Sequence, residues 1–140
     1  MAAYTSAKLT WDGGLRFTGI PDSGHPVTID SLSRPGHVAP SPVELLVIGV
    51  AGCTAMDVVS ILEKMREPLA GLDVEISGER AEKHPKYVTT ISLTYRLRGK
   101  GLSREKAERA VELSHSTYCS ALASLRPDCT VTTEIEIVDA

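Results

Sequence analysis

Hydrophobic and polar residues alternate over the first thirty positions in the way that short β-strands require. Three such runs, separated by turns that contain glycine, cover residues 8–11, 15–20 and 27–30. The first turn, Asp12-Gly13-Gly14, carries the Asp-Gly pair that favours tight hairpins. Residues 31–41 contain two prolines and one glycine and are expected to form an irregular loop. The beginning of the chain therefore predicts a small β-meander followed by a loop.

A long apolar helix is predicted over residues 42–66. Ser41 is a favourable N-cap, and Glu44, three residues later, completes a capping box. From residue 43 to residue 56 only three side chains are polar, namely Glu44, Cys53 and Thr54. Such a helix would be roughly 35 Å long, and a helix that is apolar on every side must be buried on every side. A chain of 140 residues can hardly enclose it alone, so we expect a second subunit to cover part of it.

Alternation with a period of two returns over residues 72–98 and predicts a hairpin that turns at His84-Pro85-Lys86. On its second strand one set of residues is expected to share a face, namely Tyr87, Thr89, Ile91, Leu93, Tyr95 and Leu97. Ser103 should cap a helix that breaks near residues 114–117 and resumes with Cys119. A last strand is expected to point four residues inward, namely Val131, Thr133, Ile135 and Ile137. This order of elements predicts a single α+β domain over residues 1–140.

Composition and charge exclude several classes of protein. Hydrophobic residues make up 42% of the chain, enough to build a core and to argue against disorder. The net charge of −3 and the six aromatic residues argue against a nucleic-acid partner, which requires a basic face or stacking platforms. The first residues lack the pattern of a signal peptide, and polar residues interrupt every apolar run before it reaches 18 residues. We therefore expect a cytoplasmic protein that does not interact with membranes.

The three cysteines are the main candidates for chemistry, because an odd number without a secretion signal argues for free thiols. Cys53 lies in the middle of the apolar helix, where a cysteine either packs as a small hydrophobic residue or reacts as a nucleophile. Cys119 lies in an equally helical context and either packs or traps an oxidised Cys53 as a disulfide. Asp57, one turn after Cys53, would oppose thiolate formation unless it points away or is paired. Cys129 is expected to be a bystander.

A reactive Cys53 needs a cation from elsewhere, because burial disfavours a thiolate and the apolar part of the helix contains no basic residue. Arg34, in the loop before the helix, is the best candidate, with a solvated loop arginine as the alternative. Glu44 already serves the capping box and lies roughly 13 Å from Cys53 along the helix axis, so the two should not touch within one chain. His115 and Cys119 have a spacing that can hold a metal, but no third ligand is close in sequence. Neither a metal nor a cofactor is expected.

The helix SPVELLVIGVAGCTAMDVVSILEKMR is followed, 66 residues after its cysteine, by a second cysteine in SHSTYCSAL. With these two motifs the chain resembles the OsmC/Ohr family of small bacterial thiol peroxidases over essentially its whole length. The resemblance implies an intertwined homodimer in which the sheets of both chains enclose two long helices, with active sites at the dimer interface. It also implies reduction of organic hydroperoxides to alcohols in oxidative stress defence, and the apolar surroundings of Cys53 favour alkyl or lipid hydroperoxides over hydrogen peroxide. A dithiol reductant, a lipoyl protein for some members, would then restore the thiols.

On this resemblance Cys53 is the peroxidatic cysteine, Cys119 resolves it, and Arg34 with Glu44 activates the first thiol. The sequence departs from the family at Glu44, which stands one residue later than the usual glutamate and is thereby turned about 100° around the helix. Arg16 lies near the position of the Ohr-type arginine but is displaced by one residue. The alternative function is that of a dimeric protein without catalysis, which binds small apolar or electrophilic molecules or senses them through its cysteines.

Overall fold

The computed structural model describes residues 3–139, which form two compact units divided between Leu46 and Val47. The N-terminal unit contains an antiparallel sheet with the strand order β1 (Ala7–Trp11), β2 (Phe17–Pro21) and β3 (Val27–Ile29). The amides of Asp12 and Arg16 close the first turn by donating to the carbonyls of Arg16 and Gly13, at 2.9 Å each. The φ angle of 102° at Gly13 is one that only glycine adopts readily. The predicted meander is confirmed, with β2 beginning two residues later than expected.

The register of this small sheet places its apolar side chains together. Residues directly opposite one another in antiparallel strands share a face, and the pairs Trp11–Phe17, Phe17–Ile29 and Gly19–Val27 therefore gather the apolar residues on one side. Leu9 and Trp11 on that side are 57% and 65% exposed. The sheet therefore presents an apolar face that its own unit leaves uncovered.

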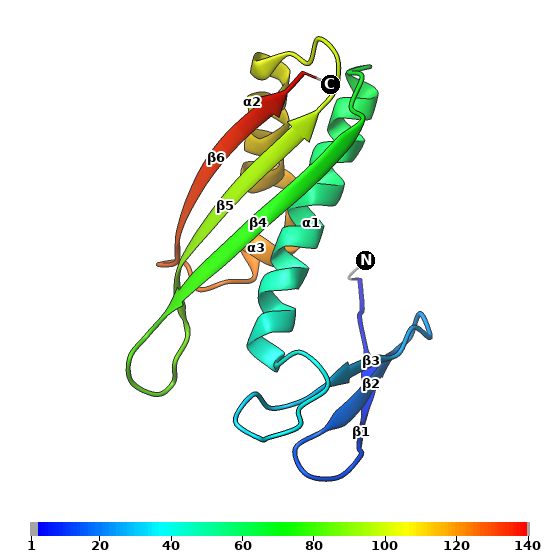
Figure 1. The fold of residues 1–140 in the computed structure, drawn as a ribbon, viewed down its shortest axis with the longest axis vertical. Coiled ribbons are helices and arrows are strands. Elements are labelled where there is room, and N and C mark those ends of the chain that lie inside the picture. The colour runs from blue at the N-terminus through cyan, green and yellow to red at the C-terminus, as the bar shows by residue number, and fades with distance from the viewer. Residues whose placement is uncertain (1–2, 140) are drawn as a thin grey trace. The chain divides into compact units, whose positions relative to one another are not determined.

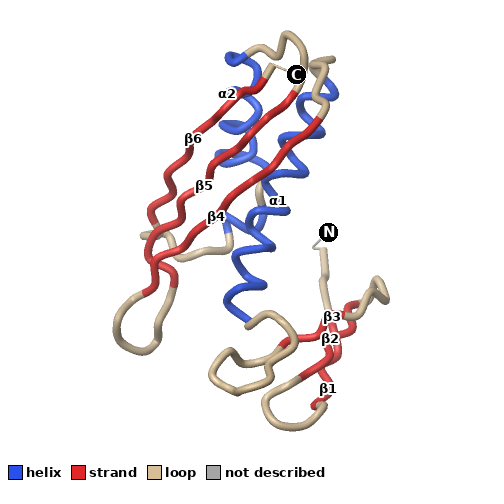
Figure 2. Tube along the Cα trace, viewed as in Figure 1, coloured by secondary structure: helices blue, strands red, loops and turns tan. Residues whose placement is uncertain are grey.

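The C-terminal unit consists of one sheet and a layer of helices. Its strand order is β4 (Gly71–Arg80), β5 (Val88–Arg98) and β6 (Thr130–Val138), with β4 antiparallel and β6 parallel to β5. The helices α1 (Pro42–Lys64) and α2 (Arg104–Leu113) lie on the same face of this sheet (Figures 1 and 2). A π-helical turn, Ser114–Tyr118, joins α2 to the short helix α3 (Ser120–Ala123), which confirms the predicted break. The fold is therefore α+β, as expected.

The core of this unit lies between the helices and β5. The buried side chains come from one stripe of α1, from one face of β5 and from α2: Val50, Val58, Leu62, Ile91, Leu93, Tyr95, Leu97, Ala107, Ala110 and Val111. The other face of the sheet is polar. There Arg96 forms ion pairs of 2.7 Å with both Glu75 and Glu136, one on each neighbouring strand. This contrast between the faces explains the alternation in the sequence.

Two details of the predicted strands are wrong. At the start of β5 the buried residue is Val88 rather than Tyr87, which is 37% exposed. The cause is an irregularity in the ladder, because Glu79 pairs with Thr90 and Arg80 pairs with Val88, so that Thr89 is passed over and the inward face shifts by one residue. In β6 the expected inward residues Val131 and Thr133 are exposed, because β6 is an edge strand of its sheet, and Thr133 lines an open groove beside α2.

Helix α1 is buried along one side only. Its buried residues Val50, Thr54, Val58 and Leu62 recur every four positions, whereas Met56 on roughly the opposite side is 74% exposed. By length and composition α1 is long and apolar enough to cross a membrane, a criterion that the central helices of soluble proteins also meet. Among the residues that the structure describes, none lies within 4 Å of a side chain added at Gly49 or Gly52. Glycine is a poor helix former, and no close packing within this part of the chain accounts for these two.

Candidate active site

The predicted capping box at the start of α1 is present. The amide of Ser41 donates to Glu44 Oε1 at 2.9 Å, and the amide of Glu44 donates to Ser41 Oγ at 3.2 Å. Both bonds satisfy backbone groups that the first turn of a helix leaves unpaired. The structure therefore gives Glu44 a structural task, in agreement with the sequence.

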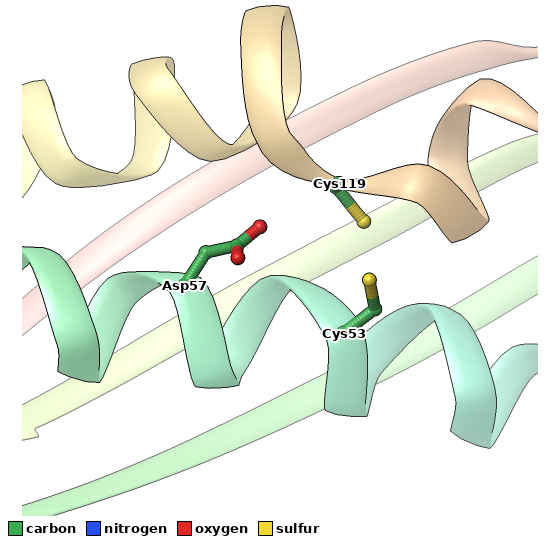
Figure 3. Close-up of side chains that lie close together, drawn as sticks. All are labelled: Cys53, Asp57 and Cys119. Atoms are coloured by element: carbon green, nitrogen blue, oxygen red, sulfur yellow. The ribbon is translucent and has the colours of Figure 1, made fainter. Parts of the chain in front are cut away.

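Cys53 and Cys119 lie side by side, although 66 positions separate them in the sequence. Their sulfur atoms and a carboxylate oxygen of Asp57 all lie within 4.8 Å of one another (Figure 3). Cys53 and Asp57 are one turn apart on α1 and project toward the segment that carries Cys119 (Figure 3). Cys53 is partly exposed, whereas Cys119 is 4% exposed. Cys53 is thus the more accessible of the two cysteines.

The break after α2 determines where Cys119 lies. The π-helical turn ends with the Cys119 amide donating to the carbonyl of Ser114 at 2.7 Å, and the backbone of Cys119 is extended. Cys119 then becomes the N-cap of α3, where its sulfur accepts a hydrogen bond from the Leu122 amide at 3.4 Å. A continuous helix would have directed this side chain elsewhere, so the break is a condition for the pair of sulfurs.

The environment of Cys119 favours its protonated form. Burial raises the pKa of the Cys119 thiol, and the neighbouring Cys53 raises it further, while the amides of Leu122 and Ala121 act in the opposite direction. Desolvation disfavours a thiolate because the charge loses its hydration. A reaction through the Cys119 sulfur would therefore require a proton acceptor.

Five polar side chains form a chain of hydrogen bonds beside the two sulfurs. Ser114 Oγ donates to Asp57 Oδ2 at 2.8 Å, and the hydroxyl of Thr54 bonds both Ser114 Oγ and Tyr95 Oη at 2.8 Å each. Tyr95 Oη also bonds His115 Nε2 at 2.7 Å. Thr54 and Ser114 are completely buried, and burial raises the pKa of Tyr95 to about 12 and lowers the pKa of His115. His115 thus bonds Tyr95 and does not belong to the cluster at Cys119.

Arg34 and Arg16 share a pocket in the N-terminal unit. Asp30 lies in this pocket and is 4% exposed at its side chain, and its carboxylate accepts from Arg16 Nε at 3.1 Å. The amides of Ser31 and Val38 also donate to Asp30, and the Ser31 bond is the largest of the effects that lower the pKa of this carboxyl. Asp30 thereby organises the loop that carries Arg34. The cysteines belong to the other unit, so the approach of either arginine to Cys53 stays a prediction.

The donors of the cysteine cluster are also compatible with a metal ion. Two thiols and a carboxylate suit a borderline-soft ion such as Zn²⁺. Within residues 3–139 this is the one group of three or more such side chains close enough to share an ion. A closed tetrahedral site needs a fourth ligand, which this group does not supply.

Comparisons with known proteins identify the family to which this chain belongs. The family model for OsmC-like proteins matches residues 34–134, and the chain belongs to the OsmC/Ohr family. Among individual relatives, protein YhfA of Escherichia coli is 38% identical over 134 residues, which are 96% of this chain and 98% of YhfA.

Solved structures show the same fold. The crystal structure of a hypothetical protein from Aquifex aeolicus is 27% identical, with 99% of both chains covered and a TM-score of 0.89. An organic hydroperoxide resistance protein OsmC from Legionella pneumophila, also described as a predicted redox protein, has a TM-score of 0.71 at 19% identity and covers 97% of this chain and 98% of its own. The second similarity supports the fold alone.

Proposed function

We propose that this protein is a cysteine-based peroxidase that reduces alkyl or lipid hydroperoxides to alcohols. The observation that carries the proposal is the pair of Cys53 and Cys119, whose sulfurs lie within 4.8 Å of each other, one partly exposed and the other buried. Family membership supports it, since the OsmC relative from Legionella pneumophila is named for organic hydroperoxide resistance.

The reaction has two steps. The Cys53 thiolate attacks the terminal oxygen of the hydroperoxide, the O–O bond breaks, and the alkoxide leaves as the alcohol after taking up a proton. Cys53 is then a sulfenic acid, which condenses with the Cys119 thiol to give a disulfide and water. A cellular dithiol, of which a lipoyl protein is one example, reduces the disulfide by thiol exchange. No cofactor is required in this scheme.

Arg34 is the proposed activating cation, with Glu44 as its partner. A guanidinium keeps its charge in an apolar environment, which suits it to stabilise a thiolate there. The capping bonds of Glu44 make Arg34 the more important of the two. Both residues belong to the N-terminal unit, and in the proposed assembly they reach a cysteine pair across the dimer interface.

The proposed assembly is an intertwined homodimer of single-domain chains in the cytoplasm. The exposed side of α1, with Met56 and Gly52, and the apolar face of the N-terminal sheet, with Leu9 and Trp11, are the surfaces that a second chain would cover. Cys53 lies on α1 between the buried stripe and this exposed side. A partner chain would therefore also complete the wall of the active site.

Intact-mass analysis after one equivalent of cumene hydroperoxide tests the proposal. The reduced protein should lose two hydrogens per chain, and peptide mapping should show Cys53 joined to Cys119 while Cys129 stays free. Turnover should appear when a dithiol is added. A protein that binds the hydroperoxide but keeps all three thiols would support the alternative, a dimeric binding or sensing protein.

A further inference from the structure

The carboxylate of Asp57 lies where a thiol peroxidase would be expected to place a cation. Its oxygen lies within 4.8 Å of both sulfur atoms (Figure 3). A negative charge at this distance disfavours a thiolate on either cysteine. Asp57 therefore does not help to activate Cys53 by its charge, and its position calls for another explanation.

Asp57 is held in place by a directed chain of hydrogen bonds. Each hydroxyl has a single hydrogen to donate. Because Ser114 donates its hydrogen to Asp57, Thr54 must donate to Ser114, and Tyr95 must then donate to Thr54. Tyr95 has no hydrogen left for His115, so the Nε2 of His115 carries the proton and donates to Tyr95. Every donor in the chain thus points toward the carboxylate, which is the arrangement that fixes and stabilises a proton acceptor.

We propose that Asp57 is a catalytic general base and acid for disulfide formation, which takes the proton of the Cys119 thiol and returns it to the leaving hydroxide. The inference rests on the proposed function. In this step the electron pair of the Cys119 sulfur forms the S–S bond, and the S–O bond of the Cys53 sulfenic acid breaks with its electrons on oxygen. The hydroxide takes the proton from Asp57 and leaves as water, so Cys119 is oxidised, Cys53 is reduced and the carboxylate is regenerated.

The surroundings of Cys119 make such a base necessary. This thiol is buried, and burial together with the neighbouring Cys53 raises its pKa. Only the amides of Leu122 and Ala121 act in the other direction. The thiol must lose its proton as the S–S bond forms, and Asp57 is the acidic side chain of the cluster. A positioned general base contributes about 10²-fold or more to such a step.

The proposal predicts that Asp57→Asn slows disulfide formation without slowing the first step. Sulfenic acid formation at Cys53 should be as fast as in the wild type or faster, because a negative charge beside that sulfur is gone. Disulfide formation should be about 100-fold slower. Stopped-flow reaction with cumene hydroperoxide, followed by trapping of the sulfenic acid with dimedone, measures both rates. Glu63→Gln removes an exposed charge farther along the same helix and should match the wild type in both steps.

The possible outcomes separate the two proposals. If the wild type forms no Cys53–Cys119 disulfide, the proposed function is wrong. If the wild type forms it and Asp57→Asn forms it equally fast, or if both steps slow by the same factor, only the role of Asp57 is overturned. Should Asp57→Asn fail to fold, Asp57→Ala offers a second test. Added formate, but not chloride at equal ionic strength, should accelerate its disulfide formation, and an absence of rescue would overturn the proposal.

Discussion

Thr54 is the central member of the buried hydrogen-bond chain, and Thr54→Val is the substitution that tests the chain most directly. Valine has nearly the shape of threonine, so the packing of α1 against β5 should survive. The hydroxyl that bonds Tyr95 and Ser114 at 2.8 Å each is lost, at a position that is completely buried. The change therefore isolates the hydrogen bonds from the volume of the side chain.

The loss of unfolding free energy in Thr54→Val depends on the hydrogen-bond partners that remain. Tyr95 keeps His115 and Ser114 keeps Asp57, so neither group is left without any partner. Two lost buried hydrogen bonds, at roughly 1 kcal/mol each with a further penalty for incomplete pairing, cost about 2–3 kcal/mol of unfolding free energy. Thr54→Ser keeps the hydroxyl and loses one methyl group, which costs about 1 kcal/mol. The valine variant should therefore be the less stable of the two, although it is the more hydrophobic.

Urea unfolding at a fixed protein concentration measures both differences, since the stability of the proposed dimer would depend on concentration. Combining Thr54→Val with Tyr95→Phe should cost less than the sum of the single changes, because both remove the same bond. If Thr54→Val unfolds within about 0.5 kcal/mol of the wild type, the buried chain does not stabilise the fold. If the stability losses of Thr54→Val and Tyr95→Phe simply add up in the double variant, the direct hydrogen bond between the two hydroxyls is refuted.

Further predictions concern the thiols and the assembly. Cys53→Ser should abolish peroxide consumption in a coupled assay, because a hydroxyl is far less nucleophilic than a thiolate, and retained turnover would contradict the mechanism. Cys119→Ser should consume about one equivalent and stop with Cys53 as a sulfenic or over-oxidised acid in the mass spectrum. Arg34→Ala should slow alkylation of Cys53 by iodoacetamide at pH 7 about tenfold, equal to roughly 1.4 kcal/mol, and Glu44→Gln should have a smaller effect. If Arg34→Ala reacts as fast as the wild type, Arg34 is not the activating cation and Arg16 is the next residue to test. Sedimentation at micromolar concentration should give twice the chain mass of 15.0 kDa, and a monomer would rule out the shared site.

Local signals in the sequence predict the elements that position the site. The serine and glutamate of the capping box identify the start of α1 because their two hydrogen bonds involve residues only three positions apart. The polar run before Cys119 breaks an otherwise helical pattern, and the structure has a π-helical turn there. The family motifs add the pairing of the two cysteines, which no local pattern contains.

The hydrogen-bond chain could not be predicted in the same way. Thr54 meets Tyr95 across 41 positions and Ser114 across 60, and Asp57 meets Ser114 across 57. Each of these residues has an ordinary local explanation, such as a polar residue within a helix or a tyrosine in a strand. The one available signal was the pair Thr54 and Asp57, which interrupts an apolar helix next to its cysteine. Their function depends on partners that only the tertiary structure supplies.

The exposed side of α1 connects the assembly with the chemistry. Leu46, Ile48, Met56 and Val59 are 37–74% exposed in a single chain, and covering them would contribute roughly 1 kcal/mol each, or about 8 kcal/mol for two helices. The exposed residues of the N-terminal sheet, Trp11 among them, add to this sum. Association costs about 4–15 kcal/mol in lost freedom of motion, so the two surfaces together are needed for a stable dimer. A partner that buries this side of the helix also desolvates the neighbouring Cys53, which makes a nearby cation more necessary. The same contact that stabilises the proposed dimer would thus create the requirement that Arg34 is proposed to meet.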